Sequence, residues 1–534
     1  MRQNYPLSTK KNHFWMVGLM IIVLTISCGV LELGVEQNDL PPLPPEFNDD
    51  VPTPNPALNN QTTQQTGQPN TQPNTQPNTQ PATTLNPTGP WLVFITGNSN
   101  YDPQIWAANP DGSAMTVLAD NVFIGGIHDE YLLPQISPNG HYLAYIEIEE
   151  QPVRAYLHIV DLPSGSDNRI VQLYDESQLG YSKEILDVIL YKASSLAWSP
   201  DGRTLAFIGA LEGGTADLYI HVPDEESVAR VSDGPGQAYL PVWSQDGQTI
   251  LHTATSLFHQ ISSYLFDPDG LWAYQADNDR MVSVPWPFRA EPDFIRYSPW
   301  YESKFIFTLG DSSPCEDNNG CWLDVVSGEK GSFPFPIIEY AISPITNSLL
   351  ATLFNTTMPS DDAGTYLFTP ENPSGRRLFA EELVNIQWLK RAGLFAGRVS
   401  TVPGLRLLQI SASGELVNTL EWDVPGEKME LASSPDGRIT AWYRWIAEPF
   451  ETGLWLGKES SGMLELIPVF PSAVHDAVWT PDGDKLFFVV DAYNAAQADT
   501  AEGLYVVNGD GEGLNYLFVI PPENYLKVLG FAGE

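Results

Sequence analysis

Two short motifs of histidine and acidic residues are the groups most able to do chemistry in this sequence. They are His128-Asp129-Glu130 and His475-Asp476, and each lies near the start of a strand that the repeat pattern places innermost in its sheet. Converging imidazole and carboxylate groups could ligate a metal or act as general base and acid. Counted five residues before each repeat landmark, however, the equivalent positions hold Leu132, Ser194, Tyr239, Asp293, Ile338, Val384, Met429 and His475.

That set is not a ring of ligands, so it indicates a polar channel rim rather than a catalytic centre. The candidate rim residues are His128, Asp129, Glu130, Tyr239, Asp293, His475 and Asp476. No catalytic residue is assigned, and we expect the chain not to be an enzyme.

Cys315 and Cys321 flank a polar Glu-Asp-Asn-Asn-Gly segment between two expected strands. Outside the cytoplasm, two cysteines that close such a loop favour a disulfide. A ring this short contributes at most about 2 kcal/mol of stability. Metal ligation by the pair is the alternative, although no further cysteine or paired histidine is nearby.

Acidic turns offer a second kind of ligand. Examples are Asp267-Pro268-Asp269-Gly270 and Asn508-Gly509-Asp510-Gly511. Calcium takes oxygen ligands, so weak Ca²⁺ binding is an option, but neither turn matches the twelve-residue EF-hand pattern. We interpret these segments as hairpin turns and expect no cofactor.

The N-terminus reads as a targeting segment. Arg2, Lys10 and Lys11 precede an apolar run from Phe14 to Ile26, the order of a secretory signal. The run ends Leu24-Thr25-Ile26-Ser27-Cys28-Gly29, which resembles a bacterial lipoprotein signal, although Thr25 stands where that family usually has Leu. The resemblance implies a lipidated Cys28 and stable anchoring.

An uncleaved signal anchor is the alternative interpretation. Both place everything after residue 30 outside the cytoplasm, at the cell surface or in a periplasm. We therefore take 1–28 as signal or anchor. Residues 29–90 are rich in Pro, Asn, Thr and Gln and are expected to form a disordered tether.

Residues 91–534 are periodic. A landmark of an apolar or aromatic residue, Ser, Pro, Asp or Asn, and Gly recurs, as in Trp198-Ser199-Pro200-Asp201-Gly202 and Trp479-Thr480-Pro481-Asp482-Gly483. Eight copies are separated by seven intervals, of which five are 45 or 46 residues. A fixed period of this length indicates a repeat architecture.

Each repeat reads as four short strands, and Pro-Asp-Gly supplies the turn between the first two. Four-stranded sheets around an axis make a β-propeller. Eight landmarks give eight units. Residues 91–120 and a last strand at Leu526–Phe531 would supply a ninth, closed by both ends. We predict an all-β fold with a single propeller of eight or nine blades.

The Trp-Ser-Pro-Asp-Gly copies, each followed by an apolar strand, resemble the TolB-type propeller repeat over 91–534. This resemblance implies the fold and leaves the function open. Related repeats also precede hydrolase domains of the prolyl-oligopeptidase kind. We expect no such domain here, because the chain ends at Glu534 and carries no Gly-x-Ser-x-Gly nucleophile motif.

The formal charge of −40, from 66 acidic and 26 basic residues, disfavours nucleic acid as a partner. We expect a monomeric, membrane-tethered propeller that binds or scaffolds a protein or peptide of the cell envelope. Two alternatives stay open. One is a ligand or Ca²⁺ sensor, and the other is a glycan-active enzyme with its site in the channel.

Overall fold

The computed structural model divides into two units, Met1–Gln76 and Pro77–Glu534. It describes residues 85–98, 103–124, 132–190, 195–225, 227–234, 236–260, 264–285, 296–308, 320–353, 363–400, 405–422, 430–443, 453–460, 463–471, 474–490, 502–520 and 524–533. The expected signal with Cys28 and nearly all of the expected tether lie outside these residues. Within them, no helix has the length and apolar character needed to cross a membrane.

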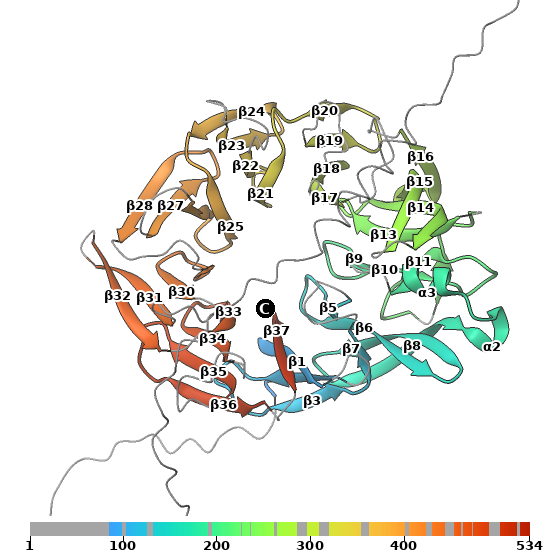
Figure 1. The fold of residues 1–534 in the computed structure, drawn as a ribbon, viewed down its shortest axis with the longest axis horizontal. Helices are drawn as coiled ribbons and strands as arrows, with labels where there is room; N and C mark the ends of the chain where they lie inside the picture. Colours follow the sequence, from blue (N-terminus) through green and yellow to red (C-terminus); the bar gives the residue numbers. More distant parts are fainter. Residues whose placement is uncertain are drawn as a thin grey trace, which may run out of the picture. The chain divides into compact units, whose positions relative to one another are not determined.

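The described part of the second unit is a propeller of nine antiparallel sheets (Figure 1). This resolves the expectation of eight or nine blades in favour of nine. The closing sheet holds β1 (Trp91–Gly97), β2 (Gln104–Ala108), β3 (Thr116–Ala119) and β37 (Tyr525–Ala532). The following sheet holds β4 (Val122–Phe123), β5 (Gln135–Ile136), β6 (Tyr142–Glu150), β7 (Val153–Asp161) and β8 (Ser166–Asp175).

The other seven sheets take four consecutive strands each, the innermost strand coming first. They are β9 (Leu196–Trp198), β10 (Leu205–Gly209), β11 (Asp217–His221) and β12 (Val228–Arg230); β13 (Gln237–Trp243), β14 (Thr249–Gln260), β15 (Tyr264–Gln275) and β16 (Arg280–Val284); β17 (Arg296–Tyr301), β18 (Lys304–Thr308), β19 (Cys321–Asp324) and β20 (Lys330–Ser332); β21 (Ile337–Ile342), β22 (Leu349–Leu353), β23 (Gly364–Thr369) and β24 (Asn372–Phe379); β25 (Leu383–Leu389), β26 (Leu394–Val399), β27 (Leu405–Ser411) and β28 (Leu416–Trp422); β29 (Glu430–Ser433), β30 (Ile439–Tyr443), β31 (Leu454–Ser460) and β32 (Met463–Phe470); and β33 (His475–Trp479), β34 (Lys485–Val490), β35 (Gly503–Asn508) and β36 (Asn515–Val519).

The ring closes through the pairing of β1 with β37. Their register runs from Trp91 opposite Ala532 to Gly97 opposite Tyr525. Leu92 and Phe94 are fully buried against Phe487 and Val489 of the preceding blade, so the closing sheet shares a core with its neighbour. The expectation that both ends of the repeat region build one blade is therefore confirmed.

The Ser-Pro-Asp-Gly turn is held by its first side chain. Ser199 Oγ donates to Asp201 Oδ1 (2.6 Å) and accepts the backbone N–H of Thr204 (3.0 Å). Gly202 has φ 69°, a conformation that costs glycine little. The same two side-chain contacts recur at Ser137, Ser244, Ser434 and Thr480. The landmark is thus a turn motif.

Three of the landmark tryptophans join neighbouring blades. The indole N–H donates to a carbonyl oxygen in the innermost strand of the preceding blade. The pairs are Trp198 with Gln135 (2.9 Å), Trp243 with Ala197 (3.0 Å) and Trp479 with Ala432 (2.9 Å). Each accepting carbonyl would otherwise have no partner strand on that side. These three tryptophans therefore hold neighbouring blades together.

Two insertions lengthen the third and fourth blades. Helices α2 (Glu176–Leu179) and α3 (Lys183–Ile189) precede β9, and α3 buries Ile185, Val188 and Ile189 in the core shared by neighbouring sheets. The second insertion extends the β14–β15 hairpin to twelve residues in each strand.

Candidate functional site

The innermost strands carry a repeated irregularity near their starts. Leu240, Asn385 and Asp476 each lie four residues before the landmark position, and have φ of 54°, 53° and 50°. In all three strands the pairing register shifts at this point. A β-bulge leaves backbone groups unpaired and re-aims nearby side chains. The starts of the innermost strands are therefore where the regular direction of the side chains changes.

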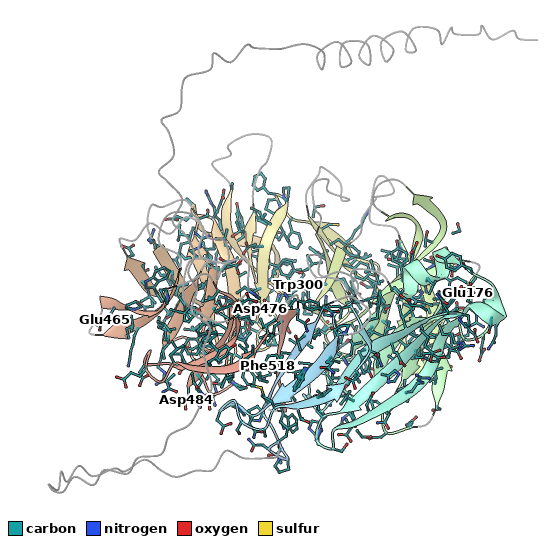
Figure 2. The ribbon with its side chains drawn as sticks, turned by 60° about the horizontal axis from the view of Figure 1, so that its bottom comes forward. Glu176, Trp300, Glu465, Asp476, Asp484 and Phe518 are labelled. Atoms are coloured by element: carbon teal, nitrogen blue, oxygen red, sulfur yellow. The ribbon has the colours of Figure 1, made fainter. Side chains whose placement is uncertain are left out.

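Asp476 is the most connected of these residues, and it lies among the inner strands (Figure 2). Its Oδ2 accepts the backbone N–H of Val528 in β37 (3.2 Å), and its Oδ1 lies 3.5 Å from Lys527 Nζ. His475 Nδ1 lies 3.6 Å from Asp476 Oδ2. Burial acts to raise the pKa of Asp476, but His475, Lys527 and the amide together hold it below its usual value.

Glu339 of β21 has the equivalent position and a similar partner. Its Oε2 accepts the backbone N–H of Ile386, which belongs to the bulge in β25 of the next blade (3.3 Å). Burial raises the pKa of Glu339, although the hydrogen bonds from the backbone amides of Ile386 and Asn385 and the charge of Arg398 oppose the rise. Two carboxylates at one repeat position thus hold the bulge amide of the following blade.

Arg398 of β26 acts on Glu339 through its charge, and we call these two residues the inner-strand sector. Burial lowers its pKa, and the charge of Glu339 opposes that effect. Its buried Nε has no hydrogen-bond partner among the described residues. An N–H group left in this state can donate to a carbonyl or carboxylate oxygen of a bound molecule. The inner-strand sector therefore holds charges of both signs together with a buried donor that no described residue uses.

The structure describes three of the seven candidate rim residues. His475 and Asp476 lie together, with 26% and 18% of their side chains exposed. Tyr239 is only 3% exposed and belongs to the core, so it forms no part of an open rim. His128, Asp129, Glu130 and Asp293 lie outside the described residues. Within the described ranges, no three His, Cys, Asp or Glu side chains are grouped to hold a metal.

Cys321 is disulfide-bonded. Its expected partner, Cys315, lies outside the described residues, so their pairing stays a prediction.

A polar cluster on the β6–β8 sheet was missed by the sequence reasoning. His158 lies between two carboxylates, with Nε2 3.0 Å from Glu147 and Nδ1 3.1 Å from Asp167. Tyr145 donates to Asp167 (2.7 Å), and Arg169 donates to Glu147 (2.6 Å). Polar residues at every second position of β6 and β7 were the available signal. Because the charges satisfy one another, the cluster is a structural network.

Comparisons with known proteins give one match in sequence and several in fold. No family model matches the chain. Over 58 residues it is 47% identical to the uncharacterized peptidase YuxL of Bacillus subtilis, a stretch that covers 11% of this chain and 9% of that protein. TolB from Acinetobacter baumannii is similar at 14% identity and a TM-score of 0.29, over 55% of this chain and 63% of that chain.

Dipeptidyl peptidase 4 from Porphyromonas gingivalis is similar at 12% identity and a TM-score of 0.44, over 75% of this chain and 64% of that chain. This chain thus spans less than two thirds of each of these three proteins. Likenesses this weak concern the fold alone, and the strand pairing establishes the propeller without them.

The expectation that the chain is not an enzyme is contradicted by the match in sequence, because that relative is named a peptidase. The expectation rested on the missing Gly-x-Ser-x-Gly motif and the scattered histidines. The shared stretch covers 11% of this chain and 9% of that protein, so any activity of this chain is a proposal.

Proposed function

We propose that this protein is a membrane-tethered, extracytoplasmic propeller that binds peptide or protein segments and takes part in their cleavage. The observation that carries the proposal is the 58-residue stretch shared at 47% identity with a peptidase. Peptides are the substrates of that class of enzyme. A propeller in such a protein would hold the chain that is to be cut.

The inner-strand sector supports a peptide rather than an ion as the bound species. A peptide carries carbonyl acceptors, N–H donors and charges of both signs. Glu339 offers a carboxylate there, whereas Arg398 offers the unused Nε. In the described residues no cluster fits a metal ion, and so no observation favours Ca²⁺ sensing over peptide binding.

The tethering part of the proposal rests on the N-terminal sequence. A lipidated Cys28 would keep the propeller at the membrane, separated from it by the Pro- and Asn-rich segment. Radiolabelled palmitate fed to cells should label the wild-type protein and not Cys28→Ala. Unlabelled wild-type protein that still fractionates with membranes would favour an uncleaved signal anchor.

The test of peptide binding and cleavage uses the purified full chain in detergent with a mixed peptide library. Mass spectrometry then counts the peptides retained and the bonds cut. We expect Arg398→Gln to reduce retention and cleavage. The control Arg203→Gln removes an exposed arginine in the turn between β9 and β10 and should change neither. A wild-type protein that neither retains nor cuts any peptide would refute the proposal.

A further inference from the structure

A polar pocket lies where the closing sheet meets the β4–β8 sheet. It has a volume of about 360 Å³ and is lined by Thr96, Gly97, Asn98, Gln104, Asp120, Asn121 and Asn524. Thr96 and Gly97 end β1, Gln104 begins β2, and Asp120 with Asn121 joins β3 to β4. The β-ladder places these segments side by side, because Thr96 pairs with both Gln104 and Leu526.

The lining has hydrogen-bonding capacity that the described protein does not use. Thr96 is 4% exposed, and its Oγ1 has no partner. Among the described residues, the side-chain amides of Asn98, Asn121 and Asn524 form no hydrogen bond. Each of these side chains has an oxygen that can accept a hydrogen bond, so together they can serve a ligand that is rich in donors.

Asp120 is the charged residue of the pocket. Its Oδ1 accepts from Gln104 Nε2 (2.6 Å), which leaves Oδ2 without a partner among the described residues. No described lysine, arginine or histidine forms an ion pair with it. Burial raises the pKa of Tyr145 most, and the charges of Asp167, Glu147 and Asp120 raise it further, so several carboxylates act on this region. A cation is therefore favoured over an anion.

The charge of the oxygen atoms in the lining favours an ammonium group over a metal ion. A single carboxylate among neutral amides gives a divalent cation little charge compensation. A primary ammonium carries one charge and three N–H donors, which match one carboxylate oxygen and two amide or hydroxyl oxygens. The volume of about 360 Å³ leaves room for the carbon chain that bears such a group.

We propose that this pocket binds the primary ammonium group of a peptide, with Asp120 as its charge partner. The group would be an amino terminus or a lysine side chain, which share this chemistry. The inference rests on the proposed function, because it takes the ligand to be a peptide. It adds a charge requirement that the inner-strand sector alone does not give.

The experiment measures binding to the full-length protein in detergent by fluorescence anisotropy. The probes are four versions of one labelled lysine-containing peptide, with the amino terminus free or acetylated and the lysine free or acetylated. Asp120→Asn keeps an oxygen for Gln104 and removes the charge. The control is Asp484→Asn. Asp484 is exposed and directly precedes β34, the second strand of its blade, whereas the pocket lies at the end of β1, the second strand of the closing blade.

We expect Asp120→Asn to weaken binding about tenfold, the effect of losing one charge-assisted hydrogen bond in an open site. Asp484→Asn should bind as the wild type does. The doubly acetylated peptide should bind as weakly to wild type as the free peptide binds to Asp120→Asn. The singly acetylated peptides identify whether the amino terminus or the lysine is recognised.

Failure of this inference differs from failure of the proposed function. Equal binding of all four peptides, unchanged by Asp120→Asn, would overturn the pocket and leave peptide binding standing. If no peptide binds, norleucine amide and N-acetyl-lysine amide serve as small ammonium probes in calorimetry. Binding of either that depends on Asp120 would keep the pocket and refute the peptide, whereas no binding would overturn both.

Discussion

The packing of the ring closure can be tested with two glycines that share a backbone conformation. Gly140 in the turn before β6 has φ 71°, and Gly165 in the turn before β8 has φ 69°. A Cβ at Gly140 would overlap the backbone nitrogen of Gly533 and lie 2.9 Å from its Cα. A Cβ at Gly165 would meet nothing within 4 Å. The pair therefore separates backbone strain from close approach.

Replacing Gly165 with alanine costs only the left-handed conformation, about 1–2 kcal/mol. Replacing Gly140 costs the same amount and adds the overlap with backbone atoms, which cannot turn aside as a side chain can. Forcing such a contact costs about 1–3 kcal/mol more. We therefore expect Gly140→Ala to lower the free energy of unfolding by about 2–5 kcal/mol.

The measurement is thermal unfolding of the two full-length variants by tryptophan fluorescence. Unfolding entropy grows with chain length, so a propeller of this size shifts its melting temperature by only about 1 °C per kcal/mol. Gly140→Ala should therefore melt about 1–3 °C below Gly165→Ala. Equal melting temperatures would show that Gly533 does not approach this turn, and would refute the closure as described.

Three further predictions concern single side chains. Trp243→Phe removes the indole bond to Ala197 and should lower the free energy of unfolding in urea by about 1–2 kcal/mol. The control Trp272→Phe changes a side chain that is 36% exposed and should lower it less. Equal losses would contradict the proposed role of the inter-blade bond. Asp476 has a pKa below its usual value in the folded state, so its stabilisation is present above about pH 4 and is lost as the pH falls through the folded pKa. Asp476→Asn should therefore make the melting temperature depend less on pH in that range. A variant whose melting temperature falls with acid as steeply as that of the wild type would contradict this. Burial lowers the pKa of His252 to about 4, so the unfolded state binds more protons than the folded state between pH 6.5 and 4. The free energy of unfolding should therefore fall by roughly 3 kcal/mol as the pH is lowered over that range. His252→Leu should remove this loss, and a variant with the same pH profile as the wild type would refute it.

Much of the fold could be predicted because its turns repeat a local chemistry. Ser199 and Asp201 bond within one turn, so the motif is visible in five consecutive residues. The closing blade has no such motif of its own. Its presence followed from counting strands at both ends of the repeat region, and only the pairing of β1 with β37 decided between eight and nine blades.

The candidate sites were less accessible to sequence reasoning. The pocket at Thr96 and Asp120 draws on four separate segments, including Asn524 from the far end of the chain. No spacing in the sequence brings these residues together, because the ring closure does so. The bond from Glu339 to Ile386 joins neighbouring blades in the same way. Each is a property of the assembled ring.

The candidate rim shows how a bulge defeats a count along the chain. Tyr239 and Ile338 occupy the same position before their landmarks, yet Tyr239 is 3% exposed and Ile338 is 55% exposed. In β13 the register shifts after Tyr239, which still pairs with Thr253, whereas in β21 the shift falls at Ile338 itself. Because side chains alternate between the faces of a strand, moving a bulge by one residue exchanges core and channel.

The position of the bulge therefore determines which repeat positions line the channel, and equal sequence spacing does not. In β33 the shift begins after His475, so Asp476 is the first residue released from regular pairing. Asp476 uses this freedom to reach the amide of Val528 in the next blade. Glu339 of β21 accepts the amide of Ile386 in the same way but stays paired with Thr352, because the shift there comes one residue earlier. A search for further binding residues in this ring should thus start from where each innermost strand loses its register.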